Sequence, residues 1–162
     1  MGVARVLRLT PDVEIDSDVT DEPVRLPFGR SRLRQVILNL ASNALEALQE
    51  QTGGKLRIEG RLRPAPEDAE GRPLPAESRG ERYLVLRFVD NGPGIAPEHQ
   101  ENLFEPFFTT RPAGTGLGLT VTYGIVDAHG GFLDFHSTEG NGSTFVVSLP
   151  VGGEPLPHEP DQ

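Results

Sequence analysis

The chain has 162 residues, a formal net charge of −9 and no cysteine, which suits one domain with one core and excludes disulfides, thiolate catalysis and cysteine metal sites. Nucleic-acid binding is not expected, because it needs lysines and arginines to neutralise phosphates, whereas a single nucleotide needs only a few local donors. No stretch approaches the roughly 18 apolar residues of a membrane span, and residues 1–10 lack the apolar core of a signal peptide. We therefore expect a cytoplasmic chain without direct membrane contact, even if a longer parent protein is membrane-anchored.

Three short strands are predicted at the N-terminus from loosely alternating apolar residues, at positions 3–9, 13–16 and 24–26. Ser31 is a suitable N-cap for the helix that comes next, in which apolar residues recur at helical spacing as far as Leu48. Gly53 and Gly54 end that helix, and residues 55–62 alternate as a strand.

Residues 63–82 are rich in proline, glutamate, glycine and arginine and have almost nothing to bury, which predicts a mobile loop between paired strands. Residues 83–89 form the next strand, and residues 97–103 a short helix with Pro97 at an early position. The later elements are predicted as a long helix over 116–129, a hairpin of strands over 132–137 and 143–149, and a disordered tail over 152–162.

Strands outnumber long helices in this order of elements, and the two types are mixed along the chain. The pattern predicts an α+β fold, in which a mixed sheet carries its helices on one face. Residues 1–151 are assigned to one domain.

Two asparagines, Asn39 and Asn43, lie four residues apart on the first helix and therefore share one helical face. From spacing alone, a solvated polar face is the commoner interpretation of such a pair. Whether the pair indicates a binding site therefore depends on the motifs downstream of it in the chain.

Two glycine clusters come after this helix, Asp90-Asn91-Gly92-Pro93-Gly94-Ile95 and Gly114-Thr115-Gly116-Leu117-Gly118-Leu119. In the first, a carboxylate can accept from an exocyclic amine, and glycines let the backbone pass close to a base; an ordinary Asn-Gly turn is the alternative. In the second, small residues expose N–H groups at a helix N-terminus, which favours phosphate; a flexible loop and cap is the alternative. Neither Walker A nor dinucleotide-fingerprint spacing is present.

From about Arg32 to Pro150, the chain resembles the ATP-binding catalytic domain of bacterial sensor histidine kinases, within the wider family of DNA gyrase, Hsp90 and MutL. The resemblance rests on four motifs in the family's order, its N, G1, F and G2 boxes: the asparagine pair, the first glycine cluster, residues 103–111 and the second glycine cluster. It implies a Bergerat-type fold, a two-layer α/β sandwich with a flexible ATP lid over residues 104–115, anchored by Phe104, Phe107 and Phe108. It also implies ATP and Mg²⁺ as cofactors.

The resemblance implies that Asn43 coordinates Mg²⁺ and that Asp90 binds the adenine amino group, which favours adenine over guanine. The matching strand hydroxyl that supports the adenine site is Ser143 or Thr144, and Ser143 fits the alignment better. The nucleotide-binding residues implied are Asn39, Asn43, Asp90, Gly92, Gly94, Ile95, Arg111, Gly114, Thr115, Gly116, Leu117, Gly118, Leu119, Ser143 and Thr144.

Position 39 separates subfamilies, because ATP-hydrolysing relatives carry glutamate there as the base that activates water. Asn39 cannot take a proton, so it favours phosphate transfer over hydrolysis. Many histidine kinases carry a basic residue three positions after the Mg²⁺ asparagine, but this chain carries Glu46. That departure leaves Arg111 as the cation for phosphate, with a solvated loop arginine as the alternative. Asn39, Asn43 and Arg111 form the expected catalytic set.

None of the four histidines lies in the helical His-Glu/Asp context of the family's phosphoacceptor. The chain is therefore expected to be the catalytic half only, which donates the γ-phosphate to a histidine on a separate helical hairpin, with a response regulator downstream. Two alternatives stay open: a non-catalytic ATP-binding regulatory module and a serine kinase of the anti-sigma type. A gyrase- or chaperone-like ATPase is disfavoured by Asn39.

Overall fold

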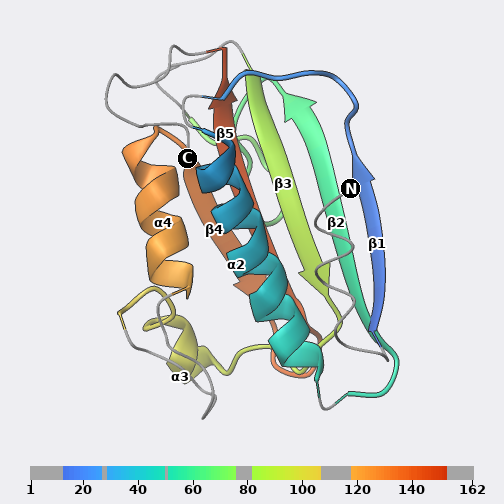
Figure 1. Cartoon of the computed structure of the whole chain (residues 1–162). Helices are drawn as coiled ribbons and strands as arrows, with labels where there is room; N and C mark the ends of the chain where they lie inside the picture. The colour runs from blue at the N-terminus through green and yellow to red at the C-terminus, as the bar shows by residue number, and fades with distance from the viewer. Residues whose placement is uncertain (1–12, 27–28, 50, 76–81, 107–117, 153–162) are drawn as a thin grey trace.

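The structure is a computed structural model and describes residues 13–26, 29–49, 51–75, 82–106 and 118–152 (Figure 1). Its centre is a five-stranded mixed sheet with the strand order β1-β2-β3-β5-β4. The strands are β1 (Val13–Val19), β2 (Gly54–Arg63), β3 (Arg82–Asp90), β4 (Phe132–Ser137) and β5 (Ser143–Val151). Only β1 and β2 pair in parallel; the other three neighbouring pairs of strands are antiparallel.

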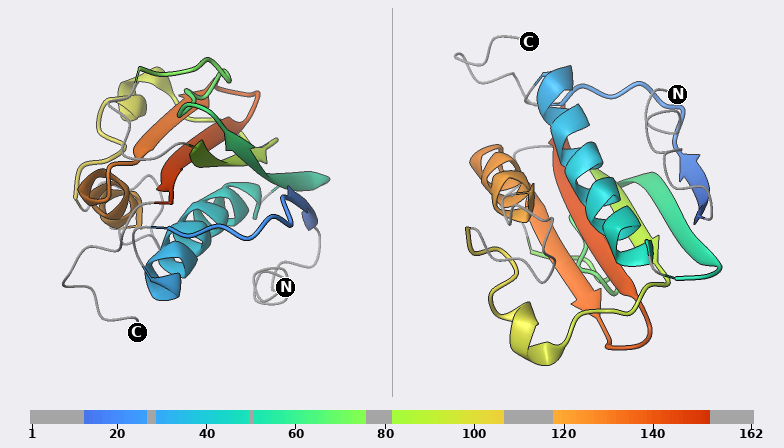
Figure 2. Two further views of the ribbon diagram at one scale, coloured as in Figure 1. Left: turned by 90° about the horizontal axis from the view of Figure 1, so that it is seen from above. Right: turned by 60° about the horizontal axis from the view of Figure 1, so that its bottom comes forward.

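The two long helices, α2 (Arg30–Leu48) and α4 (Gly118–Ala128), lie side by side on one face of the sheet (Figures 1 and 2). The short helix α3 (Pro97–Gln100) lies at one end of the sheet. This arrangement confirms the predicted α+β fold with helices on one face. Within the described ranges, no helix is long and apolar enough to cross a membrane.

The main core fills the space between this helix layer and the sheet. Helix α2 contributes the stripe Val36, Leu40, Ala44 and Leu48, which is spaced so that one side of the helix is buried. Strands β3 and β5 contribute alternate residues, since successive side chains of a strand point to opposite faces. These strand residues are Leu84, Leu86, Phe88, Phe145, Val147 and Leu149.

Two local predictions near the N-terminus are wrong. Residues 24–26 form no strand; Val24 and Leu26 alternate because they pack against the main core from an irregular segment. Helix α2 begins at Arg30 after Gly29, and no side chain caps it, so Ser31 lies inside the helix. The strand predicted over 3–9 lies outside the described residues.

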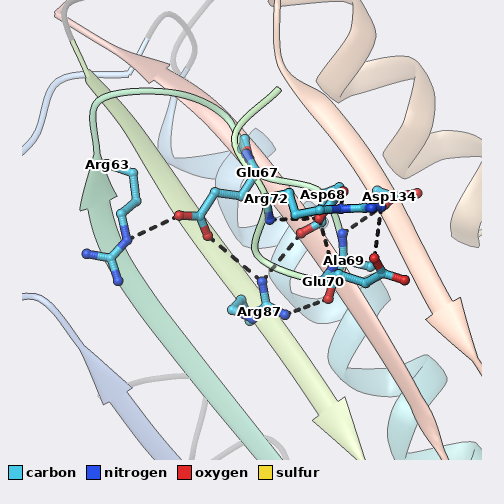
Figure 3. Close-up of polar contacts among 9 residues, drawn as sticks. Arg63, Glu67, Asp68, Ala69, Glu70, Arg72, Arg87 and Asp134 are labelled. Atoms are coloured by element: carbon cyan, nitrogen blue, oxygen red, sulfur yellow. Dashed lines mark hydrogen bonds and ion pairs between the residues drawn. The ribbon is translucent and has the colours of Figure 1, made fainter. Parts of the chain in front are cut away.

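Residues 64–75, which we call the strap, cross the face of the sheet opposite to the helices (Figure 3). Ala69 is only 6% exposed and packs in a second apolar cluster with side chains of β3 and β5. The backbone of the strap is held by side chains of the sheet: Arg87 donates to the Ala69 carbonyl (2.7 Å), Asp134 accepts from the Ala69 amide (2.8 Å), and Ser148 accepts from the Glu67 amide (3.0 Å). The prediction that residues 63–82 have almost nothing to bury is therefore wrong for the strap.

Asp68 closes the turn of the strap. Its carboxylate accepts from the backbone N–H groups of Glu70 and Arg72, both at 2.9 Å, and from the Arg72 guanidinium at 2.7 Å. These bonds, the Arg72 backbone N–H first among them, hold the pKa of the Asp68 carboxyl below its ordinary value. The turn is thus fixed by a charge-assisted network within the strap.

Candidate functional site

The polar end of the sheet brings together Asp90, the last residue of β3, and Ser143, the first residue of β5. The two residues stand directly opposite each other in the antiparallel pair, on the face that the helices cover. Both are buried, with 5% and 8% of their surface exposed. Thr144 pairs with Val89 instead, so the same alternation places it on the opposite face, away from Asp90.

Gly92 brings the turn after Asp90 close to both the carboxylate and helix α2. The Gly92 amide donates to Asp90 Oδ1 at 2.9 Å, which fixes the carboxylate orientation. A Cβ at Gly92 would lie 3.0 Å from that oxygen and 3.3 Å from the Ala47 Cβ on α2. Glycine therefore allows the backbone to pass this close to the carboxylate and to α2, where a Cβ would crowd both.

Two further glycines allow the chain to come into close contact at this end of the sheet. Gly142 has φ of 85°, and a Cβ there would lie 2.1 Å from the Asp90 carbonyl oxygen. Gly94 has φ of 71°, and a Cβ there would lie 2.2 Å from the Thr138 carbonyl oxygen. The turn after β3 therefore lies directly on the β4–β5 turn, where the Gly140 amide also donates to the Pro93 carbonyl at 2.6 Å.

Ser137 joins these two turns, and sequence reasoning missed it. Its hydroxyl accepts from the Ile95 amide at 2.8 Å and lies 2.8 Å from the Ser143 hydroxyl. The Gln100 side chain adds a second connection, because it donates to the carbonyls of Ile95 (2.9 Å) and Ser137 (3.1 Å). Ser137 and Ile95 are 42 residues apart, so no local pattern in the sequence marks the contact.

Asn39 connects the two long helices. Its amide donates to the Gly118 carbonyl and to the Thr122 hydroxyl, both at 3.2 Å, and so ties α2 to the first turn of α4. The Thr122 hydroxyl in turn donates to the Gly118 carbonyl at 2.8 Å. Asn39 therefore positions the start of α4, a role that the sequence did not indicate.

Asn43 lies one turn farther along α2 and is half-buried. In the described part of the chain, its side chain makes no hydrogen bond, so its amide is available to a ligand. Within that same part, no three His, Cys, Asp or Glu side chains gather as a metal site. The amide oxygen of Asn43 is a ligand of the type that Mg²⁺ takes, beside water and phosphate oxygens.

Phe104 anchors the described part of the predicted lid. Its ring lies 5.7 Å from that of Tyr123 on α4 and 5.6 Å from that of Phe135 on β4, measured between ring centroids. The Thr120 hydroxyl donates to the Phe104 carbonyl at 2.9 Å.

The remaining predicted site residues fall into two groups. Gly118 and Leu119 begin α4, and Leu119 packs against the main core. The others lie outside the described residues: Phe107, Phe108, Arg111, Gly114, Thr115, Gly116 and Leu117.

Residues 29–153 match the family model described as "Histidine kinase-, DNA gyrase B-, and HSP90-like ATPase". Three curated relatives illustrate the sequence similarity. The sensor histidine kinase ZraS of Salmonella typhimurium is 37% identical over 78% of this chain, the sensor kinase CckA of Brucella abortus 38% over 93%, and the sensory histidine kinase/phosphatase NtrB of Salmonella typhimurium 34% over 90%. The chain spans 23%, 15% and 39% of the length of these three relatives.

Solved structures show the same likeness. A mycobacterial sensor histidine kinase, MprB, matches with a TM-score of 0.69 and 27% identity, over 95% of this chain and 91% of that one. The catalytic domain of the histidine kinase ThkA, in a nucleotide-free form, matches with a TM-score of 0.63 and 27% identity, over 92% of this chain and 83% of that one.

Proposed function

Since the chain belongs to the family of histidine kinase-, DNA gyrase B- and HSP90-like ATPases, we propose that residues 1–151 bind Mg·ATP and donate its γ-phosphate to a histidine on a separate helical hairpin. The hairpin would belong to the same parent protein or to a partner chain, and a response regulator would receive the signal downstream. The three relatives are all named as sensor kinases, which supports this function over the other classes within the family.

The observation that carries the proposal is the buried carboxylate of Asp90 at the end of β3. This carboxylate is oriented by the Gly92 amide, and the glycine lets the backbone pass close to it and to α2. A carboxylate in this position accepts a hydrogen bond from the exocyclic amine of adenine, whereas guanine presents an oxo group at the same place. Ser143 stands beside it on the same face of the sheet.

The phosphates would extend from the base toward Asn43 and the start of α4. Asn43 would supply one oxygen to Mg²⁺, and the ion, when bound, neutralises charge on the phosphates. Asn39 holds the first turn of α4 against α2 through its contacts with Gly118 and Thr122. Arg111 and the cluster from Gly114 to Leu119 would complete the phosphate site, by analogy with the family's motifs.

Catalysis would then consist of positioning and charge stabilisation rather than covalent chemistry by this chain. The side chain of Asn39 is an amide, which cannot act as a general base toward water. Transfer to an acceptor side chain is therefore favoured over hydrolysis, and the cognate hairpin supplies that acceptor.

The test of transfer combines this chain with its cognate helical hairpin and labelled ATP. The expected result is acid-labile, base-stable phosphohistidine on the hairpin, and neither self-phosphorylation nor rapid ATP hydrolysis by the chain alone. Arg111→Ala is expected to lower transfer more than ADP binding, because its contact would be chiefly with the terminal phosphate. If ATP binds but no transfer occurs with the cognate hairpin, the chain is a regulatory ATP-binding module instead.

The test of the base site compares ATP with GTP by calorimetry. We expect a clear preference for ATP, and Asp90→Asn should weaken ATP binding by roughly 1.5–3 kcal/mol, because an amide loses the charge-assisted part of the bond. Equal affinities for ATP and GTP would refute the assignment of Asp90 to the base.

A further inference from the structure

The chain contains two Asn-Gly pairs, Asn91-Gly92 and Asn141-Gly142, and each lies in one of the two turns that meet at the polar end of the sheet. Such pairs can undergo a reaction of the backbone itself. The nitrogen of the glycine attacks the side-chain carbonyl carbon of the asparagine, and glycine has no side chain to hinder the attack. The structure gives the two pairs different hydrogen bonds, which separates them chemically.

The reaction passes through a cyclic imide. The glycine nitrogen loses its proton and forms a bond to the Cγ of asparagine, while the side-chain nitrogen takes up a proton and leaves as ammonia. Water then opens the ring at one of its two carbonyl carbons. One opening gives aspartate. The other gives isoaspartate, in which the main chain runs through the side-chain carbon and is longer by one carbon. Water is the only co-reactant, and no oxidation or reduction takes place.

Three hydrogen bonds oppose this reaction at Asn91. Its side-chain oxygen accepts from the Lys55 amide at 2.7 Å, and its side-chain nitrogen donates to the Gly53 carbonyl at 3.1 Å, so the side chain is fixed against the start of β2. The attacking nitrogen, that of Gly92, donates to the Asp90 carboxylate at 2.9 Å. Its deprotonation would bring two negative charges into contact. These bonds must open before the ring can close.

Asn141 lacks these restraints. Within the described ranges, neither its side-chain amide nor the Gly142 N–H forms a hydrogen bond. The backbone N–H of Asn141 donates to the Thr138 carbonyl at 2.9 Å, which holds the turn but leaves the side chain able to rotate. Burial does not distinguish the two pairs, because in both of them the asparagine is exposed and the glycine is buried. The difference between the pairs therefore lies in their hydrogen bonds.

We propose that Asn141 is a site of non-enzymatic conversion to aspartate and isoaspartate, and that isoaspartate at this position disrupts the close contact between Gly142 and Asp90. A Cβ at Gly142 would lie 2.1 Å from the Asp90 carbonyl oxygen, so the backbone here has no room to move toward β3. An extra main-chain carbon directly before Gly142 displaces this glycine. Since Asp90 is assigned to the base, the conversion slowly lowers nucleotide affinity, a consequence that rests on the proposed nucleotide site.

The first experiment incubates the folded 162-residue chain at mildly alkaline pH and follows the peptide of each Asn-Gly pair by mass spectrometry. Replacement of the side-chain NH₂ by a hydroxyl raises the peptide mass, and chromatography separates isoaspartate from aspartate. Asn141 should convert faster than Asn91 by about tenfold or more, the factor that the opening of two or more hydrogen bonds supplies. Asn91 is thus the internal control.

The same incubation in urea removes the hydrogen bonds of the folded chain, and the two asparagines should then convert at similar rates. Asn141→Gln is the matched variant, because it keeps the amide but must close a larger ring, which is much slower. This variant should lose the conversion at position 141 and leave that of Asn91 unchanged. Equal rates in the folded chain would overturn the proposal, as would conversion of Asn141 in urea only.

The second experiment compares ADP binding by calorimetry in the fresh chain, the isoaspartate form and Asn141→Asp. The isoaspartate form should bind ADP severalfold more weakly, whereas Asn141→Asp should bind it as the wild type does, because it adds the charge without the extra carbon. Equal losses in the two, or no loss in the isoaspartate form, would refute the displacement of Gly142. A fresh chain that does not bind ADP would refute the nucleotide site, and the two conversion rates would still decide the modification site.

Discussion

Replacement of Asn39 by aspartate tests whether this side chain ties the two long helices together. The carboxylate has the shape of the amide but no N–H group, so both bonds, to the Gly118 carbonyl and the Thr122 hydroxyl, lose their donor. Each neutral bond contributes about 0.5–1.5 kcal/mol, so the free energy of unfolding should fall by about 1–3 kcal/mol. For a chain of this size, the melting temperature should fall by about 2–12 °C.

The loss of stability in Asn39→Asp should depend on pH, and the groups around residue 39 set the direction of this dependence. The introduced carboxyl would face two oxygens, so its protonated form, which can donate, is favoured and its folded-state pKa is raised above the unfolded value of about 3.9. A raised folded-state pKa adds stability that is fully present below the unfolded pKa and is lost as the pH rises through the folded one. The difference between wild type and Asn39→Asp should therefore be smaller near pH 4 than at pH 7.

The assay is thermal unfolding followed by circular dichroism, without nucleotide, at both pH values. Asn43→Asp is the matched control, because it makes the same chemical change one turn away, where the amide has no hydrogen bond with the described residues. The control should change stability by less than about 0.5 kcal/mol. Equal losses in the two variants, or no loss in Asn39→Asp, would refute the inter-helix role.

Three other predictions concern the turns and the proposed Mg²⁺ site. In urea unfolding, Gly142→Ala should lower the free energy of unfolding far more than Gly140→Ala does. Both glycines have positive φ, which costs an alanine about 1–2 kcal/mol. Only at Gly142, however, would the added Cβ meet a backbone oxygen, that of Asp90 at 2.1 Å. Equal losses of stability in the two variants would contradict this close contact. Asp68→Asn should lower the free energy of unfolding at pH 7, and its difference from wild type should shrink below about pH 4. The reason is that a carboxyl with a lowered folded-state pKa contributes stability that is lost as the pH falls through that pKa. A difference in the free energy of unfolding that persists at pH 2 in urea titrations would contradict this. Asn43→Ala should abolish the Mg²⁺ dependence of ADP binding in calorimetry with little change in melting temperature, and an unfolded variant would instead indicate a structural role.

Local periodicity was sufficient for most of the elements. Alternation over residues 55–62 predicted β2, the strongly apolar run over 83–89 predicted β3, and helical spacing up to Leu48 predicted most of α2. The periodic signals work because β2 and α2 each bury one face, whereas β3 is buried on both faces and is therefore a continuous apolar run. The order of the four motifs along the chain also indicated the family, because such motifs are defined by residue types and spacing in the sequence.

Composition, by contrast, failed for the strap. Its prolines and charged residues resemble those of a solvated loop, but its backbone groups are satisfied by Arg87, Asp134 and Ser148 on three different strands. The hydrogen-bond partners of the strap's backbone lie on strands of the sheet, so the sequence of the strap alone does not indicate them.

The sequence by itself determined the fold class and most of the elements, and it predicted the chemical types of the candidate site residues, because each of these depends on neighbouring residues. Only the tertiary structure decided which of them meet. Asn39 and Gly118 are 79 residues apart, and Ser137 and Ile95 are 42 apart, yet each pair forms a hydrogen bond. Side-chain alternation from the register of β3 and β5 also put Ser143, and not Thr144, on the face of Asp90. Hydrogen bonds act over about 3 Å, so such contacts depend on how elements pack and not on their separation along the chain.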